Sequence, residues 1–78
     1  MHKETISGEQ AFRAFAANGT LAIGPSSSGY TLQYSADGVN YTAWDEATAA
    51  DENVVVANVP YGMYLKLSGN TADVVVIW

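Results

Sequence analysis

The chain has 78 residues, no cysteine, and 3 Lys and Arg against 8 Asp and Glu, which gives a formal net charge of −5. The acidic balance and the lack of a basic cluster argue against nucleic-acid binding, which needs cations facing the phosphates. The longest apolar stretches, 54–57 and 74–78, are far shorter than the roughly 20 residues of a membrane-spanning helix, so we expect no membrane segment. One domain of this size has a marginal core, and we expect it to associate as a homo-oligomer.

Turn residues recur every few positions and separate runs rich in Val, Tyr, Thr and Leu. This punctuation is typical of all-β domains. The sequence therefore predicts a small antiparallel β-sandwich, Ig-like or jelly-roll-like, with six to seven short strands.

The first segment, 1–17, has apolar residues outside the regular pattern. By propensity 10–17 could form a short helix, but we favour a strand, because two helical turns would cover little of a sheet. The segment is expected to be either an N-terminal arm that attaches the protein to a partner or the first strand of the domain. The β-sandwich domain itself is predicted over 18–78, with a weaker strand at 20–23.

A clear alternation follows at 30–35, where Tyr30, Leu32 and Tyr34 fall on one face. Asp37-Gly38 predicts a tight turn that pairs this strand with 39–44. Farther on, 53–57 is predicted as a strand that stops before Pro60.

A second hairpin is expected between 63–68 and 73–78, where 74–78 is apolar on both faces and is expected to be covered on both. The core candidates from these patterns are Leu32, Val39, Tyr41, Val55, Leu65, Leu67, Val74 and Val76.

Catalytic chemistry finds little support. The only histidine, His2, lies beside the first residue, where it offers no fixed base for a nucleophile. Four carboxylates lie within 45–52, namely Asp45, Glu46, Asp51 and Glu52, but their order does not match a calcium loop. We therefore expect a solvated acidic loop, no catalytic residue, no metal and no cofactor.

The aromatic residues carry more information. Five Tyr and two Trp against two Phe favour rings that keep one end in water, as at protein interfaces and sugar platforms. The interface candidates are Phe12, Phe15, Trp44, Tyr61 and Tyr64. A sugar platform would instead need two or three coplanar exposed rings among Tyr30, Tyr41, Trp44, Tyr61 and Tyr64.

Two segments carry a resemblance. Residues 34–44, YSADGVNYTAW, resemble the S-x-D-G-x-x-[FYW]-T hairpin of phage virion and bacterial surface β-sandwich modules. Residues 59–76, from Val-Pro-Tyr-Gly to the Val-Val-Val run, resemble the closing half of the same modules. Together they are similar to small capsid decoration (auxiliary capsid) and head-fibre proteins of tailed bacteriophages.

The resemblance implies a non-enzymatic structural protein of the virion that decorates or stabilises the capsid surface or anchors a head fibre. Its partner would be the major capsid protein or another virion protein. The protein itself would be synthesised in the host cytoplasm and would reside on the capsid surface. No catalytic or metal residue is implied. The alternative is a carbohydrate-binding β-sandwich module.

Overall fold

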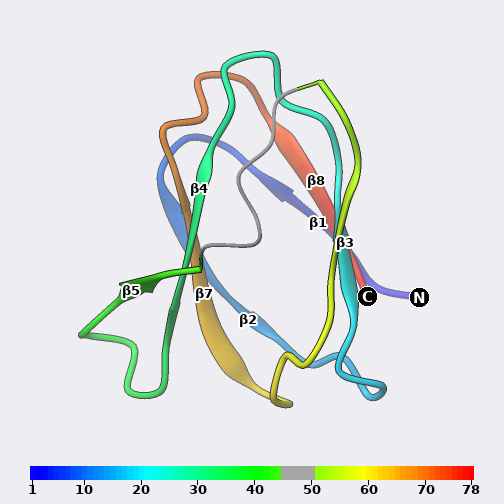
Figure 1. The fold of residues 1–78 in the computed structure, drawn as a ribbon, viewed down its shortest axis with the longest axis vertical. Helices are drawn as coiled ribbons and strands as arrows, with labels where there is room; N and C mark the ends of the chain where they lie inside the picture. Colours follow the sequence, from blue (N-terminus) through cyan, green and yellow to red (C-terminus); the bar gives the residue numbers. More distant parts are fainter. Residues whose placement is uncertain (45–50) are drawn as a thin grey trace.

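The computed structural model describes residues 1–44 and 51–78, and these contain eight strands and no helix (Figure 1). The strands are β1 (Lys3–Ile6), β2 (Gln10–Ala14), β3 (Leu21–Ile23), β4 (Thr31–Ser35), β5 (Thr42–Ala43), β6 (Val54–Val56), β7 (Met63–Ser68) and β8 (Val74–Ile77). They form two antiparallel sheets, which we call sheet A, with the order β1-β8-β3-β6, and sheet B, with the order β2-β7-β4-β5. The predicted all-β sandwich is confirmed, with eight strands in place of six to seven.

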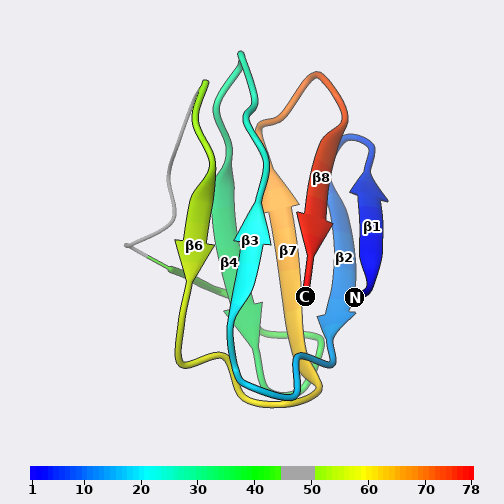
Figure 2. The ribbon, with the colours of Figure 1, turned by 90° about the vertical axis from the view of Figure 1, so that its right-hand side faces the viewer.

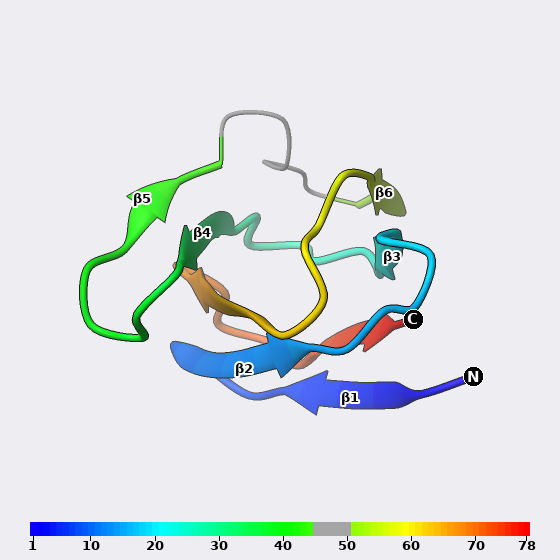
Figure 3. The ribbon, with the colours of Figure 1, turned by 90° about the horizontal axis from the view of Figure 1, so that it is seen from below.

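The two sheets lie face to face as layers, which Figure 3 shows from below and Figure 2 shows with sheet A in front. All connections except β4 to β5 cross from one sheet to the other. Eight antiparallel strands in this order form a jelly roll, in which the chain wraps around one core as two Greek keys.

The core lies between the sheets and takes alternate residues from most strands. Its completely or nearly completely buried large side chains are Ile6, Leu21, Ile23, Leu32, Leu65, Leu67, Val74 and Val76. Five of the predicted core residues are thereby confirmed: Leu32, Leu65, Leu67, Val74 and Val76.

The N-terminal segment contributes a strand to each sheet. β1 pairs with β8, and β2 pairs with β7 from Gln10 opposite Leu67 to Ala14 opposite Met63. The preference for a strand over a helix in this segment is confirmed. β1 has no counterpart in the sequence prediction because Lys3–Ile6 offers a single apolar residue, Ile6, and hence no visible alternation.

The predicted hairpin between 63–68 and 73–78 is wrong. β7 belongs to sheet B and pairs with β2 and β4, whereas β8 belongs to sheet A and pairs with β1 and β3. The connecting residues 69–73 cross between the layers. The run 74–77 is also not covered on both faces, since Val75 on its outer side is 36% exposed.

Three core predictions are also wrong. Val55 is 70% exposed because it is the outward residue of the edge strand β6, whose neighbours Val54 and Val56 pack toward the core. Val39 is 78% exposed because it lies in the loop after β4 and not in a strand. Tyr41 is half-buried, with its ring against Lys66 on the outer side of sheet B.

The pairing of the first predicted hairpin is confirmed, although its turn is longer than two residues. Gln33 lies opposite Ala43 and Tyr34 opposite Thr42, and the loop between β4 and β5 runs from Ala36 to Tyr41. Gly38 has a φ of 77°, as the Asp-Gly pair suggests.

Candidate binding surface

A cluster of rings around one cation occupies the outer side of sheet B. Arg13 on β2 lies directly opposite Tyr64 on β7, because the pairing of these strands places both side chains on the solvent side. Phe15 follows β2, and Tyr61 lies in the turn before β7. We call Arg13, Phe15, Tyr61 and Tyr64 the ring–cation cluster.

The guanidinium of Arg13 lies over two rings of this cluster. Its carbon Cζ is 4.5 Å from the centre of the Tyr64 ring and 5.1 Å from that of Phe15. Phe15 in turn meets Tyr61 edge to face, with ring centres 5.3 Å apart. Such contacts fix the direction of the guanidinium while leaving it in reach of solvent and partners.

Backbone geometry at Gly62 holds the cation in place. Nε of Arg13 donates a hydrogen bond of 3.1 Å to the Gly62 carbonyl, and Gly62 adopts a φ of 83°. A Cβ at this position would lie 3.2 Å from a terminal nitrogen of Arg13. Glycine therefore serves both the turn and the close approach of the guanidinium.

A second cation extends the cluster along β7. Nζ of Lys66 lies 4.5 Å from the centre of the Tyr41 ring and 3.7 Å from a carboxylate oxygen of Glu9. Two of the three cationic side chains of this acidic protein thus lie on the outer side of sheet B. Arg13 differs from Lys66 because it has no ion pair with a carboxylate among residues 1–44 and 51–78.

The surface continues into a pocket of about 430 Å³ that Arg13, Phe15 and Trp78 help to line. The Trp78 ring stacks on Phe12 with centres 6.1 Å apart and also contacts His2 at 4.4 Å. Nε2 of His2 lies 2.9 Å from Oε1 of Glu4, and both residues also line the pocket. The volume of this pocket falls in the lower part of the range of about 300–1,000 Å³ found for ligand pockets.

The five interface candidates from the sequence do not form one site. Phe15, Tyr61 and Tyr64 come together in the ring–cation cluster, with Tyr61 71% exposed and Phe15 44% exposed. Phe12 is half-buried and packs against the core. Trp44 also packs against the core and meets Tyr34 edge to face, with ring centres 5.3 Å apart.

The sugar platform finds less support than the interface. Tyr30 is only 4% exposed, and Trp44 packs against the core, so neither offers an open ring face. In the ring–cation cluster, Phe15 and Tyr61 are inclined by 68° and are not coplanar. Of the other candidates, Tyr64 and Tyr41 each have a ring face covered by a cation, Arg13 and Lys66 respectively.

Sequence reasoning missed the cations of the surface. No local pattern in the sequence singles out Arg13 or Lys66. The choice of Leu65 and Leu67 as core residues leaves Tyr64 and Lys66 on the outer face, which is a partial signal. The pairing of β2 with β7, which brings Arg13 to Tyr64, cannot be inferred from that alternation.

The groups considered for chemistry remain scattered. Within residues 1–44 and 51–78, no cluster of three or more His, Cys, Asp or Glu side chains could hold a metal ion. Asp45 and Glu46 of the acidic segment lie outside the described residues, whereas Asp51 and Glu52 are exposed. The same described residues contain no helix long and apolar enough to cross a membrane.

Comparisons with protein-family models, with curated proteins and with solved structures found no match to this chain.

Proposed function

We propose that this protein is a non-enzymatic structural component of a phage virion, and that it binds a protein partner on the capsid through the ring–cation cluster. The observation that carries the binding role is Arg13, held between Phe15 and Tyr64 without a carboxylate partner among the described residues. The virion setting rests on the resemblance of residues 34–44 and 59–76.

Arg and aromatic residues are the side chains most often found at the energetic centre of protein interfaces. An ordered guanidinium loses little conformational entropy on binding and can form two parallel hydrogen bonds with a carboxylate. The partner that fits this surface is therefore a protein segment with an Asp or Glu that reaches Arg13, flanked by apolar side chains for Phe15 and Tyr61.

The jelly-roll fold agrees with this proposal without deciding it. Viral capsid proteins and lectins both use the fold, so it suits a virion protein and a carbohydrate-binding module alike. The state of the rings favours the protein interface, because cations cover one face each of Phe15, Tyr64 and Tyr41.

Mass spectrometry of purified tailed-phage particles that encode this chain tests the virion setting, and binding of the chain to capsids that lack it tests the surface. We expect Arg13→Gln to weaken capsid binding at least tenfold, which corresponds to about 1.4 kcal/mol. The control is Ala72→Gln, which introduces the same side chain at an exposed position of the loop between β7 and β8 and should change binding less than twofold.

Absence of the chain from the particles would overturn the virion setting. Equal binding by Arg13→Gln and wild type would overturn the role of the ring–cation cluster. Clear binding to a glycan array, together with absence from virions, would support the carbohydrate-binding alternative instead.

A further inference from the structure

The outer side of sheet A is a second surface, distinct from the ring–cation cluster. Its outward side chains form two rows across the four strands. In the first row Lys3 lies opposite Ile77, Ile77 opposite Ala22, and Ala22 opposite Val55. The second row includes Thr5 and Val75, and Gly24 joins it by donating a hydrogen bond of 2.7 Å to the Val75 carbonyl. We call these residues the sheet A face.

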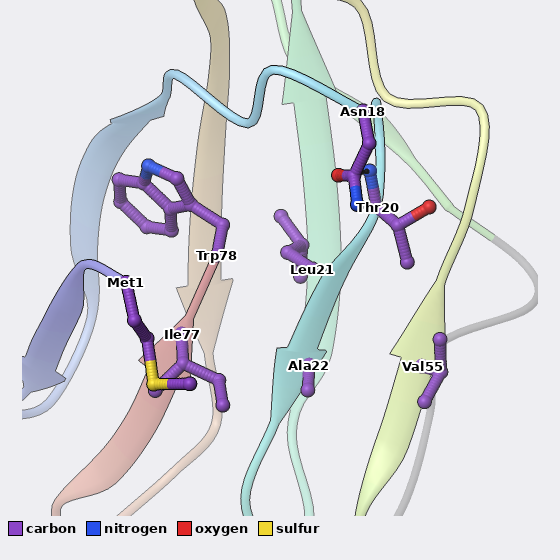
Figure 4. Close-up of a pocket in the computed structure, with 8 residues that line it drawn as sticks. All are labelled: Met1, Asn18, Thr20, Leu21, Ala22, Val55, Ile77 and Trp78. Atoms are coloured by element: carbon purple, nitrogen blue, oxygen red, sulfur yellow. Dashed lines mark hydrogen bonds between the residues drawn. The ribbon is translucent and has the colours of Figure 1, made fainter.

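A shallow groove runs along β3 on this face. Its floor is formed by Ala22 and Gly24, which have almost no side chain. Val55 of β6 flanks it on one side and Ile77 of β8 on the other (Figure 4). Two hollows of about 290 and 210 Å³ lie along the groove, and both are lined by Ala22 and Ile77. Val75 and Ile77 form a ridge beside it.

The charge distribution of the face is unusual for this protein. The chain carries a net charge of −5, yet Lys3 is the one charged residue among the outward positions of sheet A. Val55 is 70% exposed and Val75 36% exposed. An apolar surface without carboxylates is the part of an acidic protein that can meet a second copy of itself without like-charge repulsion.

We propose that a second copy of this chain covers the sheet A face, related by a two-fold axis that runs along the strands between β8 and β3. Two sheets that pack face to face align within about 30° and interdigitate their side chains. The order β1-β8-β3-β6 has its centre between β8 and β3. The axis therefore lays the β8 ridge of each copy over the β3 groove of the other.

The same axis places β1 of each copy over β6 of the other. Lys3 then faces the partner's Val55. The contact is self-complementary, because the ridge of each copy fills the groove of the other. An isologous dimer requires this reciprocity, and a foreign partner would have to supply both a ridge and a groove itself.

Sedimentation of the purified chain across a concentration series tests the dimer. Because only a few side chains contribute, the interface is small, and we expect a dissociation constant on the order of 10 μM. The species should change from 8.3 kDa to twice that mass, 16.6 kDa. A monomer that persists at concentrations of about 1 mM, a hundred times that constant, would overturn the proposal.

Substitution of Val55 tests the arrangement of the two copies. Val55→Lys would place a second cation opposite Lys3 in both halves of the dimer, and we expect the dissociation constant to rise at least tenfold. Val55→Glu would place a carboxylate there, and its dimer should be at least threefold tighter than that of Val55→Lys. Net charge alone predicts the reverse order, because Val55→Glu makes the chain more acidic.

Val39→Lys and Val39→Glu are the matched controls, since Val39 is equally exposed but lies in the loop after β4. Both should keep the wild-type dissociation constant within threefold, and circular dichroism should show all four variants folded. If Val55→Lys dimerises as tightly as Val55→Glu or more tightly, the proposed axis is wrong. The chain alone is used throughout, so the result is independent of the capsid experiments.

Discussion

The carboxylate of Asp37 organises the loop between β4 and β5. It accepts hydrogen bonds from the backbone amides of Asn40 and Val39, both at 2.9 Å, and from the Ser35 hydroxyl at 2.7 Å. The Asn40 side-chain amide donates a further bond of 2.8 Å to its second oxygen. The backbone bonds from Asn40 and Val39, followed by the side-chain bonds, hold the pKa of Asp37 far below its usual range.

This bonding predicts a pH dependence of stability. A carboxyl whose pKa is lower in the folded state stabilises the protein fully above its unfolded pKa of about 3.9, and this contribution is lost as the pH falls through the folded pKa. We expect Asp37→Asn to lower Tm at pH 7, with the difference from wild type shrinking as the pH falls below about 4.

Thermal unfolding followed by circular dichroism from pH 7 to pH 2 measures this difference. Asp51→Asn, the same change at another exposed carboxylate, is the control and should leave Tm nearly unchanged. A Tm difference for Asp37→Asn that stays constant over the whole pH range would contradict the role of the ionised carboxylate.

Tyr30 presents the opposite situation, a polar group without a hydrogen-bond partner among the described residues. Its ring lies in the core, and its buried hydroxyl forms no hydrogen bond with any residue in 1–44 or 51–78. Burial also raises the pKa of this hydroxyl. Since an unpaired buried polar group opposes folding, we expect Tyr30→Phe to leave the free energy of unfolding unchanged or to raise it by up to about 1 kcal/mol.

Urea unfolding of the two proteins checks this expectation. A loss of more than about 1 kcal/mol in Tyr30→Phe would show that the hydroxyl is hydrogen-bonded in solution, and the prediction would then be wrong.

At the scale of elements, β1 decides whether the N-terminal segment is an arm or part of the sandwich. Ile6 is completely buried on the inner side of β1, opposite Val74. We therefore expect Ile6→Ala to lower the free energy of unfolding by about 2 to 5 kcal/mol. Thr5→Ala, on the exposed side of the same strand, should change it by less than about 0.5 kcal/mol.

Both values come from urea unfolding of the full chain. A small effect of Ile6→Ala, comparable to that of Thr5→Ala, would mean that β1 adds little to the fold and behaves as an arm.

The positions of strands were predictable where alternation or turn residues mark them locally. The pairing between strands was not predictable. The alternation in 30–35 identified β4, and turn residues bounded β3, β6 and β7. The assignment of β7 and β8 to one hairpin failed because a five-residue connection between them suits a loop within one sheet as well as a crossing between two. Three consecutive valines at 54–56 likewise hide which of them points outward.

The candidate site was likewise predictable from the sequence only in part. Composition indicated Tyr and Trp rings with one end in water. Of the five chosen rings, Phe15, Tyr61 and Tyr64 share one surface, whereas Trp44 packs against the core. The position of Arg13 depends on the register between β2 and β7, whose residues are about 50 positions apart in the sequence. No local pattern carries that information, so the central cation of the cluster could be found only in three dimensions.

At the scale of the whole molecule, the two ends of the described fold meet. β8 lies between β1 and β3, and the backbones of His2 and Trp78 exchange hydrogen bonds of 2.7 and 3.0 Å beside it. Figure 2 shows β8 as an inner strand of sheet A with β1 at the edge. The only strand that pairs with β1 is thus the last of the eight in the chain.

This order has a consequence for synthesis. While the first 73 residues emerge from a ribosome, β1 has no neighbour and β3 lacks the partner that joins it to β1. Sheet A can be completed only after β8 has been synthesised, so the full sandwich cannot form on a shorter nascent chain. A prematurely terminated chain keeps two unpaired strand edges, which invite proteolysis or aggregation. Only chains synthesised through β8 can then persist in the folded form.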